Sequence, residues 1–544
     1  MQMIRNLRFE KATPWCVLGV MVAIAVSGMV PPTVVPSDAD PTEFSAERAF
    51  EHVEAIAAHT RPIGSPGSEM ARSYIVHRLE ALGLTPDLQT ITVRDYFGEG
   101  EVPVVNILAR IEGTASTGAI VLMGHYDTVP PTTGANDNAT AVAAVLETGR
   151  ALLAGPPLRN DVILLLTDGE EPAPRFGSTA FVEDHPLAAD VRLAINLEAV
   201  GGSGVSQLIE VAGDEGALIF HLAAAVPRPV VSSVVDDIVE LIGGSNTDIA
   251  PFRDRGIAGL EFAYLGGSPI YHLPADNIDS VHQGSLQHHG THALGLAQRF
   301  GDLDLAAIDG ESQEVFFSLF GRIVIHYPAW LGIVLAVIAG AMLATTLWLD
   351  SRRGRLSIRG IAAGAGWLFL VATVAAALVA IVWRTLVTAL WDSGGPMGVQ
   401  AVGWMIVLAA IAIGSTVPFY RRLSRRVGRV EIEWAAVALW WILAMVVSLV
   451  MPGAGYLFIW PVLAAVVAAA FQSRQEWIVL AIVSAPAVIL TVPVMDTFFQ
   501  MGLPRPGNVD SQIPEIVLLG GFFISLLVVL LTPHIHMGVG RTKE

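Results

Sequence analysis

The segment GHYDTVPPTTGANDN, residues 124–138, brings an imidazole and two carboxylates into one short stretch of chain. His125 and Asp127 directly follow the apolar run 119–123, and Asp137 lies in the Gly/Asn-rich loop beyond them. Imidazole and carboxylate groups are side chains with which proteins bind divalent cations, zinc among them. The segment therefore predicts part of a metal site at the end of a strand.

Three later segments carry the same residue types, each after or at the end of an apolar run. Glu170 and Glu171 occur in TDGEE, Glu198 in INLEAV and His272 in YHLPADN. In open α/β sheets, sites form beyond the carboxyl ends of the strands. We therefore expect these distant side chains to gather along one edge of a sheet.

Such a cluster of carboxylates is costly to bury unless cations compensate its charge. With the histidines neutral, the five candidate ligands carry a charge of −3. Two Zn²⁺ ions and one bridging hydroxide would bring the total to zero, which suits a partly buried site. The candidate ligands are His125, Asp137, Glu171, Glu198 and His272.

Short apolar runs rich in Ile, Leu and Val must position these side chains. Strands buried on both faces are predicted over 119–124, 161–167, 192–197 and 257–263. Apolar residues at helical spacing predict one helix over 139–155 and another over about 216–226. This alternation predicts an α/β domain over residues 40–305, with a mostly parallel central sheet flanked by helices.

The composition indicates a membrane-embedded region and argues against nucleic acid as a partner. The chain has 544 residues, is 53% hydrophobic and only 15% charged, which is typical of membrane proteins. Residues 31–315 hold 40 Asp and Glu against 14 Arg and no Lys, a net charge of −26. Such a domain would repel nucleic acid. The one cysteine, Cys16, excludes an intrachain disulfide and a cysteine zinc site.

Apolar segments long enough to span a membrane occur near the N-terminus and throughout the C-terminal part of the sequence. Residues 14–30 follow basic residues and predict a signal anchor within 1–35, with a cleaved signal peptide as the alternative. After a juxtamembrane linker at 306–327, we expect an all-α membrane domain over 328–535 and a cytoplasmic tail at 536–544. Its seven spans are expected near 328–349, 361–388, 401–419, 434–451, 455–471, 478–494 and 516–533.

Basic residues fill alternate loops between these spans, at 352–359, 421–429, 474 and 541–543. By the positive-inside rule, those loops are cytoplasmic. Counting back places residues 31–315 outside the cytoplasm, as do the basic residues that precede residue 14. Because the chain has one cysteine and one Asn-x-Ser/Thr sequence, at Asn138, a prokaryotic plasma membrane is favoured.

In their order, GHYD, GANDNATAVAAVLE, TDGEE, NLEAVGG and YHLPADN resemble the M28 family of zinc metallopeptidases, which have an aminopeptidase-like fold. The resemblance covers residues 45–300, and five separated motifs in order are far more specific than one. QEVFFSLFGRIVIHYP, at 313–328, and the multi-span tail resemble the membrane-bound branch, which includes the endoplasmic reticulum metallopeptidase and the vacuolar membrane protease. The Glu of NLEA also fits that branch, since secreted relatives often have Asp there.

The resemblance implies a role for each candidate ligand. Asp137 would bridge two zinc ions. Glu171 and His272 would complete the shell of one ion, and His125 and Glu198 that of the other. It also implies hydrolysis of peptide bonds, with removal of N-terminal residues the expected activity, and so peptides and the lipid bilayer as partners.

Two further residues take roles beside the metal. By the same resemblance, Glu170 is the general base, and Asp127 orients the imidazole of His125. The chain departs from the family after Glu171, where PAPRFGS replaces Gly-Leu-x-Gly-Ser. Because that loop borders the substrate cleft, the departure bears on side-chain preference.

The other histidines and acids have plainer interpretations. Asp168 is expected to shape the turn before Glu170, and Asp248 is a weaker candidate for the lining of the site. Asp276 and Asp279 are expected to cap a helix or to orient His272. We interpret five histidines as structural, the last three on a surface helix: His221, His282, His288, His289 and His292.

Other functions remain open at this stage. The same fold could support glutaminyl cyclisation with a single zinc ion, which counting metal ions per chain would reveal. A non-catalytic scaffold would have lost ligands, whereas here the full set and the base are present. The membrane tail could transport a substrate, which a flux assay on a chain without residues 31–315 would test.

Overall fold

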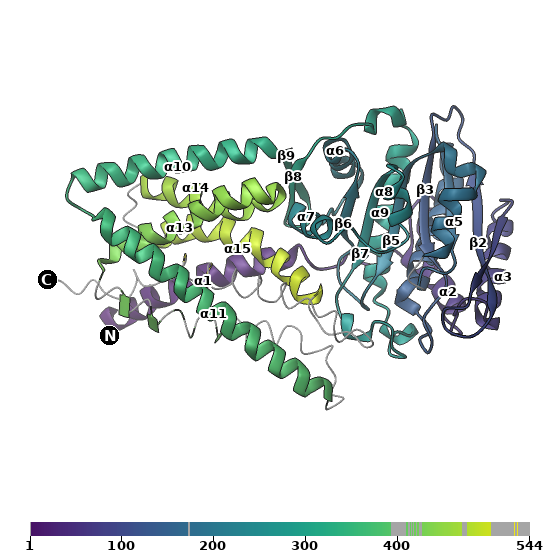
Figure 1. The fold of residues 1–544 in the computed structure, drawn as a ribbon, viewed down its shortest axis with the longest axis horizontal. Helices are drawn as coiled ribbons and strands as arrows, with labels where there is room; N and C mark the ends of the chain where they lie inside the picture. The colour runs from purple at the N-terminus through teal and green to yellow at the C-terminus, as the bar shows by residue number, and fades with distance from the viewer. Residues whose placement is uncertain are drawn as a thin grey trace. The chain divides into compact units, whose positions relative to one another are not determined.

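The computed structural model describes residues 2–171, 175–392, 427–470 and 476–501, with isolated residues elsewhere. These residues form two compact units. One comprises residues 29–326, and the other comprises residues 2–28 together with those from 327 onward. Figure 1 labels their elements.

A seven-stranded mixed sheet organises the unit of residues 29–326, in the order β1-β2-β4-β3-β5-β7-β6. The four strands β4, β3, β5 and β7 are parallel, while β1, β2 and β6 pair antiparallel at the two edges. The strands are β1 (Asp87–Arg94), β2 (Glu101–Ile111), β3 (Ala119–His125), β4 (Asp161–Thr167), β5 (Val191–Ala199), β6 (Gln207–Ala212) and β7 (Ala258–Tyr264). The predicted α/β fold is confirmed, and the four predicted strands are its parallel centre.

Both faces of this centre are covered, because alternate side chains of a strand point to opposite sides. Leu122 and Leu164 pack with α2, α3, α4, α6 and α9, whereas Met123 and Leu165 pack with α5 and α8. The helices are α2 (Ala46–Ile56), α3 (Pro66–Ala81), α4 (Ala141–Ala154), α5 (Phe176–Asp184), α6 (Glu215–Ala225), α7 (Ser233–Leu241), α8 (Ala250–Asp254) and α9 (Gln283–Gly301). Short 3-10 or π turns are η1 (Ala135–Thr140), η2 (Pro186–Asp190), η3 (Ser268–Ile270), η4 (Ile278–Ser280) and η5 (Leu305–Ile308).

The segment expected to be a juxtamembrane linker is largely folded. It contains η5 and a two-stranded sheet of β8 (Glu314–Leu319) and β9 (Ile323–Pro328). Phe316 of β8 is fully buried in the main core of the domain. Burial of a large aromatic side chain stabilises this attachment by roughly 2 kcal/mol, so the globular unit extends further than the strand–helix alternation indicates.

The second unit is built from long apolar helices, as expected of a membrane protein. They are α1 (Gln2–Ser27), α10 (Ala329–Arg352), α11 (Ile358–Asp392), α13 (Arg429–Val450), α14 (Tyr456–Ala470) and α15 (Glu476–Met501), with the short turn η7 (Pro452–Ala454). Five segments among the described residues are long and apolar enough to cross a membrane: 329–352, 358–382, 430–450, 452–469 and 478–501. The spans expected at 401–419 and 516–533 fall largely outside the described residues.

Candidate metal centre

All seven candidate residues lie at or beyond the carboxyl ends of the four parallel strands. His125 ends β3, and Glu198 is the next-to-last residue of β5. Because parallel strands all end at the same sheet edge, segments far apart in sequence meet there. The remaining five follow a strand: Asp127 and Asp137 after β3, Glu170 and Glu171 after β4, and His272 after β7.

Asp137 occupies the middle of the cluster, and its two carboxylate oxygens face different histidines. Oδ1 lies 3.2 Å from Nε2 of His125. Oδ2 lies 3.3 Å from Nε2 of His272. A carboxylate placed in this way can offer one oxygen to each of two cations.

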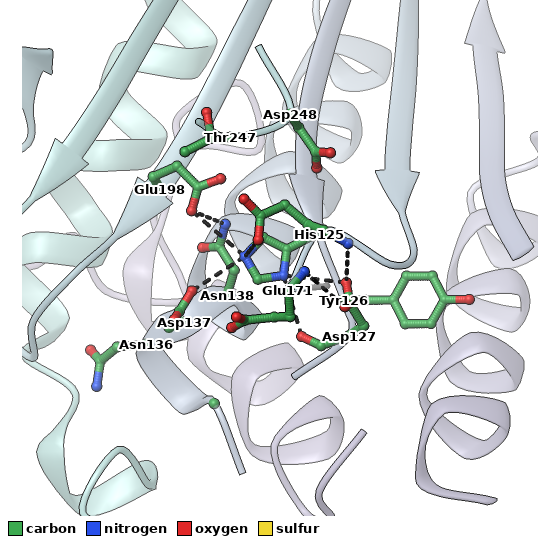
Figure 2. A network of polar contacts seen from close by, with 12 residues as sticks. His125, Tyr126, Asp127, Asn136, Asp137, Asn138, Glu171, Glu198, Thr247 and Asp248 are labelled. Carbon is green, nitrogen blue, oxygen red and sulfur yellow. Dashed lines mark hydrogen bonds and ion pairs between the residues drawn. The ribbon is translucent and has the colours of Figure 1, made fainter. Parts of the chain in front are cut away.

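Each histidine also has a glutamate of its own. Nε2 of His125 lies 3.6 Å from Oε2 of Glu198, and Nε2 of His272 lies 3.0 Å from Oε2 of Glu171. Figure 2 shows Glu198 and Asp137 converging on the His125 ring. The structure thus divides the five candidates into two His–Glu pairs that share Asp137. This grouping is the one that the family resemblance implies.

The donor atoms suit a bound cation. One ligand atom each from His125, Asp137 and Glu171 lie within 4.8 Å of one another. Asp137 Oδ2, Glu171 Oε1 and His272 Nε2 are buried and make no hydrogen bond within the described residues. Burying such atoms without a hydrogen bond costs free energy, although His272 Nε2 lies within ion-pair distance of both carboxylates. Coordination to a metal would offset that cost. Nitrogen and oxygen donors of this kind fit Zn²⁺.

The pKa values show how strongly the cluster requires positive charge. Burial lowers the pKa of His125, but the carboxylates around it, Glu198 first, raise it well above its usual value. For His272 burial is likewise outweighed, and Asp137 and Glu171 raise its pKa to about 10. Burial and the Asp137 charge raise the pKa of Glu171 to about 7. A metal cation that displaces the imidazole protons would supply the same positive charge.

Glu170 is the more accessible of the two adjacent glutamates. Its side chain is 12% exposed, against 3% for Glu171. Its Oε2 lies 3.9 Å from Nε2 of His125, further away than the oxygens of Asp137 and Glu198. Burial, together with the Glu198 and Glu171 charges, raises the pKa of Glu170 well above its usual value.

Asp127 lies behind the cluster and is fully buried. Its Oδ1 is 3.5 Å from Nδ1 of His125, and its main-chain oxygen is 3.3 Å from that nitrogen. The main-chain N–H groups of Glu170 and Glu171 donate to its Oδ1 and Oδ2, both at 3.2 Å. One carboxylate therefore ties the end of β3 to the turn after β4.

Asp276 fixes the loop that carries Asp137. Its Oδ1 accepts hydrogen bonds from the main-chain N–H and the side-chain amide of Asn136, each at 2.8 Å. Its Oδ2 accepts one from the main-chain N–H of Asp137 at 3.1 Å. From the sequence, Asp276 is expected to cap a helix or to orient His272. In the structure it instead holds the loop of another candidate ligand, Asp137. Asp279, by contrast, is exposed.

Asn138 and Arg61 are positioning residues that the sequence interpretation missed. The amide of Asn138 donates to Oε2 of Glu198 at 3.0 Å. The fully buried guanidinium of Arg61 donates to main-chain oxygens around the site, among them Tyr126 at 2.6 Å and Gly134 at 3.0 Å. The sequence could have identified Asn138, because it directly follows the candidate ligand Asp137. No local pattern marks Arg61 as buried.

The three histidines of α9 contact other parts of the domain. The prediction that α9 carries its histidines at the surface is wrong. His288, His289 and His292 are buried, because α9 packs against α2, α4 and α6. His288 accepts from Ser206 N and donates to Arg228 O, which holds it neutral, and burial lowers its pKa to about 4.

The structure also shows the contacts of three further residues considered in the sequence analysis: Asp168, His282 and Asp248. Asp168 accepts a hydrogen bond from Val105 N and so shapes the turn before Glu170. His282 caps α9 by accepting from Ser285 N. Asp248 lies beside the cluster (Figure 2) and is buried. It accepts a hydrogen bond from the Thr167 hydroxyl.

Comparison with known proteins extends these observations. Mouse endoplasmic reticulum metallopeptidase 1 is 27% identical over 332 residues, 57% of this chain and 37% of that protein. The vacuolar membrane protease of Candida albicans is 27% identical over 280 residues, 51% of this chain and 32% of that protein. The chain thus spans only about a third of the length of these relatives. Both relatives are eukaryotic, so the prediction of a prokaryotic membrane is not supported.

Among solved structures, Porphyromonas gingivalis glutaminyl cyclase is similar, with a TM-score of 0.40 and 21% identity over 46% of this chain and 97% of that one. The Bacillus subtilis zinc aminopeptidase has a TM-score of 0.39 and 15% identity over 50% of this chain and all of that one, 100%. At these values neither structure bears on the activity.

The family model for peptidase family M28 matches residues 106–297, which run from β2 into α9 and include every candidate residue. Residues 106–297 of this chain thus form a peptidase family M28 domain.

Proposed function

We propose that this chain is a membrane-anchored metallopeptidase that holds two zinc ions and removes N-terminal residues from peptides. The observation that carries the proposal is the position of Asp137, whose two oxygens face two histidines. A single-ion site would need only one of the two His–Glu pairs.

Five side chains would hold the ions: His125 and Glu198 one, Glu171 and His272 the other, with Asp137 shared between them. When bound, two such ions lower the pKa of a shared water and stabilise the developing oxyanion. The chain itself supplies the preorganisation, because Asp127, Asn138 and Asp276 fix these side chains or the loops that carry them.

Glu170 would act as general base. It is adjacent to the ligand Glu171 and more accessible, and its main chain is held by Asp127. Its carboxylate would take the proton of the attacking water and pass it to the leaving amine, which requires hydrogen-bond reach of both. Its raised pKa describes the cluster before cations are added.

The charge around the cluster favours substrates with a free amino group. Glu170 and Asp248 are not among the five proposed ligands, and Asp248 lies close enough to help raise the pKa of Glu170 by repulsion. Their negative charges would remain once the two cations balance the ligands, and negative charge attracts a cationic α-amino group. This is the physical support for an aminopeptidase rather than a carboxypeptidase.

The test compares Glu170→Gln with the matched control Glu183→Gln, an exposed glutamate on α5. Hydrolysis of peptides with free or acetylated N-termini is measured alongside zinc content per chain. We expect Glu170→Gln to lose turnover by at least about 100-fold with both zinc ions retained, and the control to resemble the wild type. Turnover that survives in Glu170→Gln would remove Glu170 from the mechanism.

The same measurements address glutaminyl cyclisation. One zinc ion per chain, with ammonia released from N-terminal glutamine and no peptide cleaved, would overturn the proposal in favour of a cyclase. Two ions and chelator-sensitive cleavage of unblocked peptides support the peptidase.

A further inference from the structure

Asn196 and Glu261 are two buried polar residues at the centre of the sheet, beside the candidate metal centre. They are register partners on the parallel strands β5 and β7, and they are 0% and 1% exposed. Oδ1 of Asn196 and Oε2 of Glu261 are buried and make no hydrogen bond within the described residues. Unpaired polar atoms are costly in the interior of a protein. Packing alone therefore does not account for this pair.

The amide of Asn196 lies between Glu261 and the candidate ligand Glu198. Its NH₂ group donates to Oε1 of Glu198 at 3.2 Å and to Oε1 of Glu261 at 3.3 Å. Asn196 and Glu198 are two residues apart on β5, so their side chains leave the same face of the sheet. Burial first, and then the repulsion from Glu198, raises the pKa of Glu261 to about 8. A donor shared between the two carboxyl groups replaces part of that repulsion by attraction.

Glu261 determines which way the Asn196 amide faces. If the amide were flipped, its oxygen would meet two carboxyl groups in place of the NH₂ group. Thr247 holds Glu261 in turn, because its hydroxyl donates to Oε1 of Glu261 at 2.5 Å and accepts from Asn196 at 3.2 Å. Figure 2 shows Thr247 next to Glu198. Asn196, Glu261 and Thr247 thus form one set of mutual contacts adjoining Glu198.

The two candidate glutamate ligands differ in this support. Oε1 of Glu198 accepts from Asn196, while its Oε2 accepts from Asn138 and faces Nε2 of His125 at 3.6 Å. A carboxylate with a hydrogen bond at each oxygen is fixed in one orientation before a cation binds. Glu171 lacks this, because its Oε1 makes no hydrogen bond within the described residues. The two proposed ions are therefore expected to depend on different contacts.

We propose that Glu261 is a positioning residue that acts through Asn196 to orient Glu198 toward its metal ion. This inference rests on the two-ion site of the proposed function and goes further, because it makes only one of the two ions depend on Glu261. The accepting oxygen of Glu261 is what matters here, and glutamine also provides such an oxygen. Glu261→Gln is therefore the conservative variant, and Glu261→Met removes the acceptor while keeping the length of the side chain.

The test measures the zinc affinity of full-length protein by competition with a chelator. We expect Glu261→Met to bind one of the two ions about 10- to 100-fold more weakly. Glu261→Gln should restore that affinity to within about threefold of the wild type. The matched control is Glu314→Met, since Glu314 is also a buried glutamate on a strand but pairs with His326. This control should bind both ions as the wild type does.

Two single-ion backgrounds identify the affected ion. A His272→Ala protein keeps the ligands His125 and Glu198, and adding Glu261→Met should weaken its remaining ion by the same factor. A His125→Ala protein keeps Glu171 and His272, and there Glu261→Met should leave the affinity unchanged. The opposite pattern would overturn the inference.

Two further variants test the route through Asn196. If Glu261 acts through this amide, adding Glu261→Met to Asn196→Ala should lower the zinc affinity no further. Thr247→Val removes a single hydroxyl at a half-buried position and should weaken the same ion about three- to tenfold. Its affinity decides the matter if Glu261→Met does not fold, and a wild-type value would then overturn the inference.

Three results would overturn the inference and leave the peptidase function intact. They are wild-type zinc affinity in folded Glu261→Met, an additional loss in the double variant with Asn196→Ala, and an equal loss in Glu314→Met, which would indicate a general effect on stability. Wild-type protein that binds fewer than two zinc ions would instead overturn the proposed function.

Discussion

Asp127 and Glu170 are joined through the main chain, since Oδ1 of Asp127 accepts the N–H of Glu170 at 3.2 Å. Its other oxygen accepts the N–H of Glu171 at the same distance. The proposed base and a proposed ligand therefore inherit their positions from one buried carboxylate at the end of the neighbouring strand. The sequence motif indicated only a contact between Asp127 and His125.

Asp127→Asn should disrupt this connection while preserving volume. An asparagine presents one oxygen and one NH₂ group, so one of the two N–H donors would face another donor. We expect kcat/KM to fall about 10- to 100-fold, the usual cost of losing an outer-shell partner. The measurement is peptide hydrolysis with zinc content determined in parallel.

Asp184→Asn, an exposed substitution on α5, is the control for Asp127→Asn. Unchanged kinetics in Asp127→Asn would mean that the turn after β4 holds itself in place.

Asp276→Ala should weaken metal binding without touching a ligand. It removes the acceptor of three hydrogen bonds, two from Asn136 and one from the Asp137 N–H. Because the loop that carries Asp137 would lose its anchor, we expect zinc affinity to fall about 10- to 100-fold. Competition with a chelator measures it, and the exposed Asp279→Ala is the matched neighbour. Equal affinities in the two variants would contradict the prediction.

The raised pKa of Glu215, which lies outside the candidate metal centre, leads to a prediction of how the stability of the domain depends on pH. Burial raises its pKa to about 7, reinforced by the Asp237, Glu240 and Glu314 charges and opposed by the N–H of Glu314. A carboxyl whose folded pKa is raised stabilises the fold below its unfolded pKa, near 4.5, and loses that contribution as pH rises through about 7.

Thermal midpoints at about pH 5 and about pH 8 test this sign. The midpoint of the wild type should drop more between the two than that of Glu215→Gln, which cannot ionise but keeps an acceptor for the Glu314 N–H. Glu183→Gln serves as an exposed control. An equal drop in all three proteins would show that Glu215 titrates normally.

The alternating basic loops predict that the peptidase domain lies outside the cytoplasm. In a Cys16→Ser background, single cysteines are introduced as Glu183→Cys, in the domain, and Arg353→Cys, in the basic turn after α10. An impermeant maleimide should label the first in sealed cells or vesicles of known sidedness, and the second only after permeabilisation. The reverse pattern would invert the topology.

The sequence alone determined the parallel centre of the sheet and the types of residue at its edge. Strands buried on both faces are continuous apolar runs, so 119–124 and 161–167 are recognisable without their neighbours. The edge strand β1 alternates between exposed and half-buried residues and pairs antiparallel with β2, and no comparably strong local pattern marks it.

Tertiary structure alone decided which side chains face one another. That Asp137 turns one oxygen to His125 and the other to His272 depends on Asp276 holding the loop from another part of the chain. The burial of Arg61 and of the α9 histidines likewise depends on packing. Local sequence records the propensity of a segment and the chemistry of its residues, whereas contacts between distant segments arise only when the core assembles.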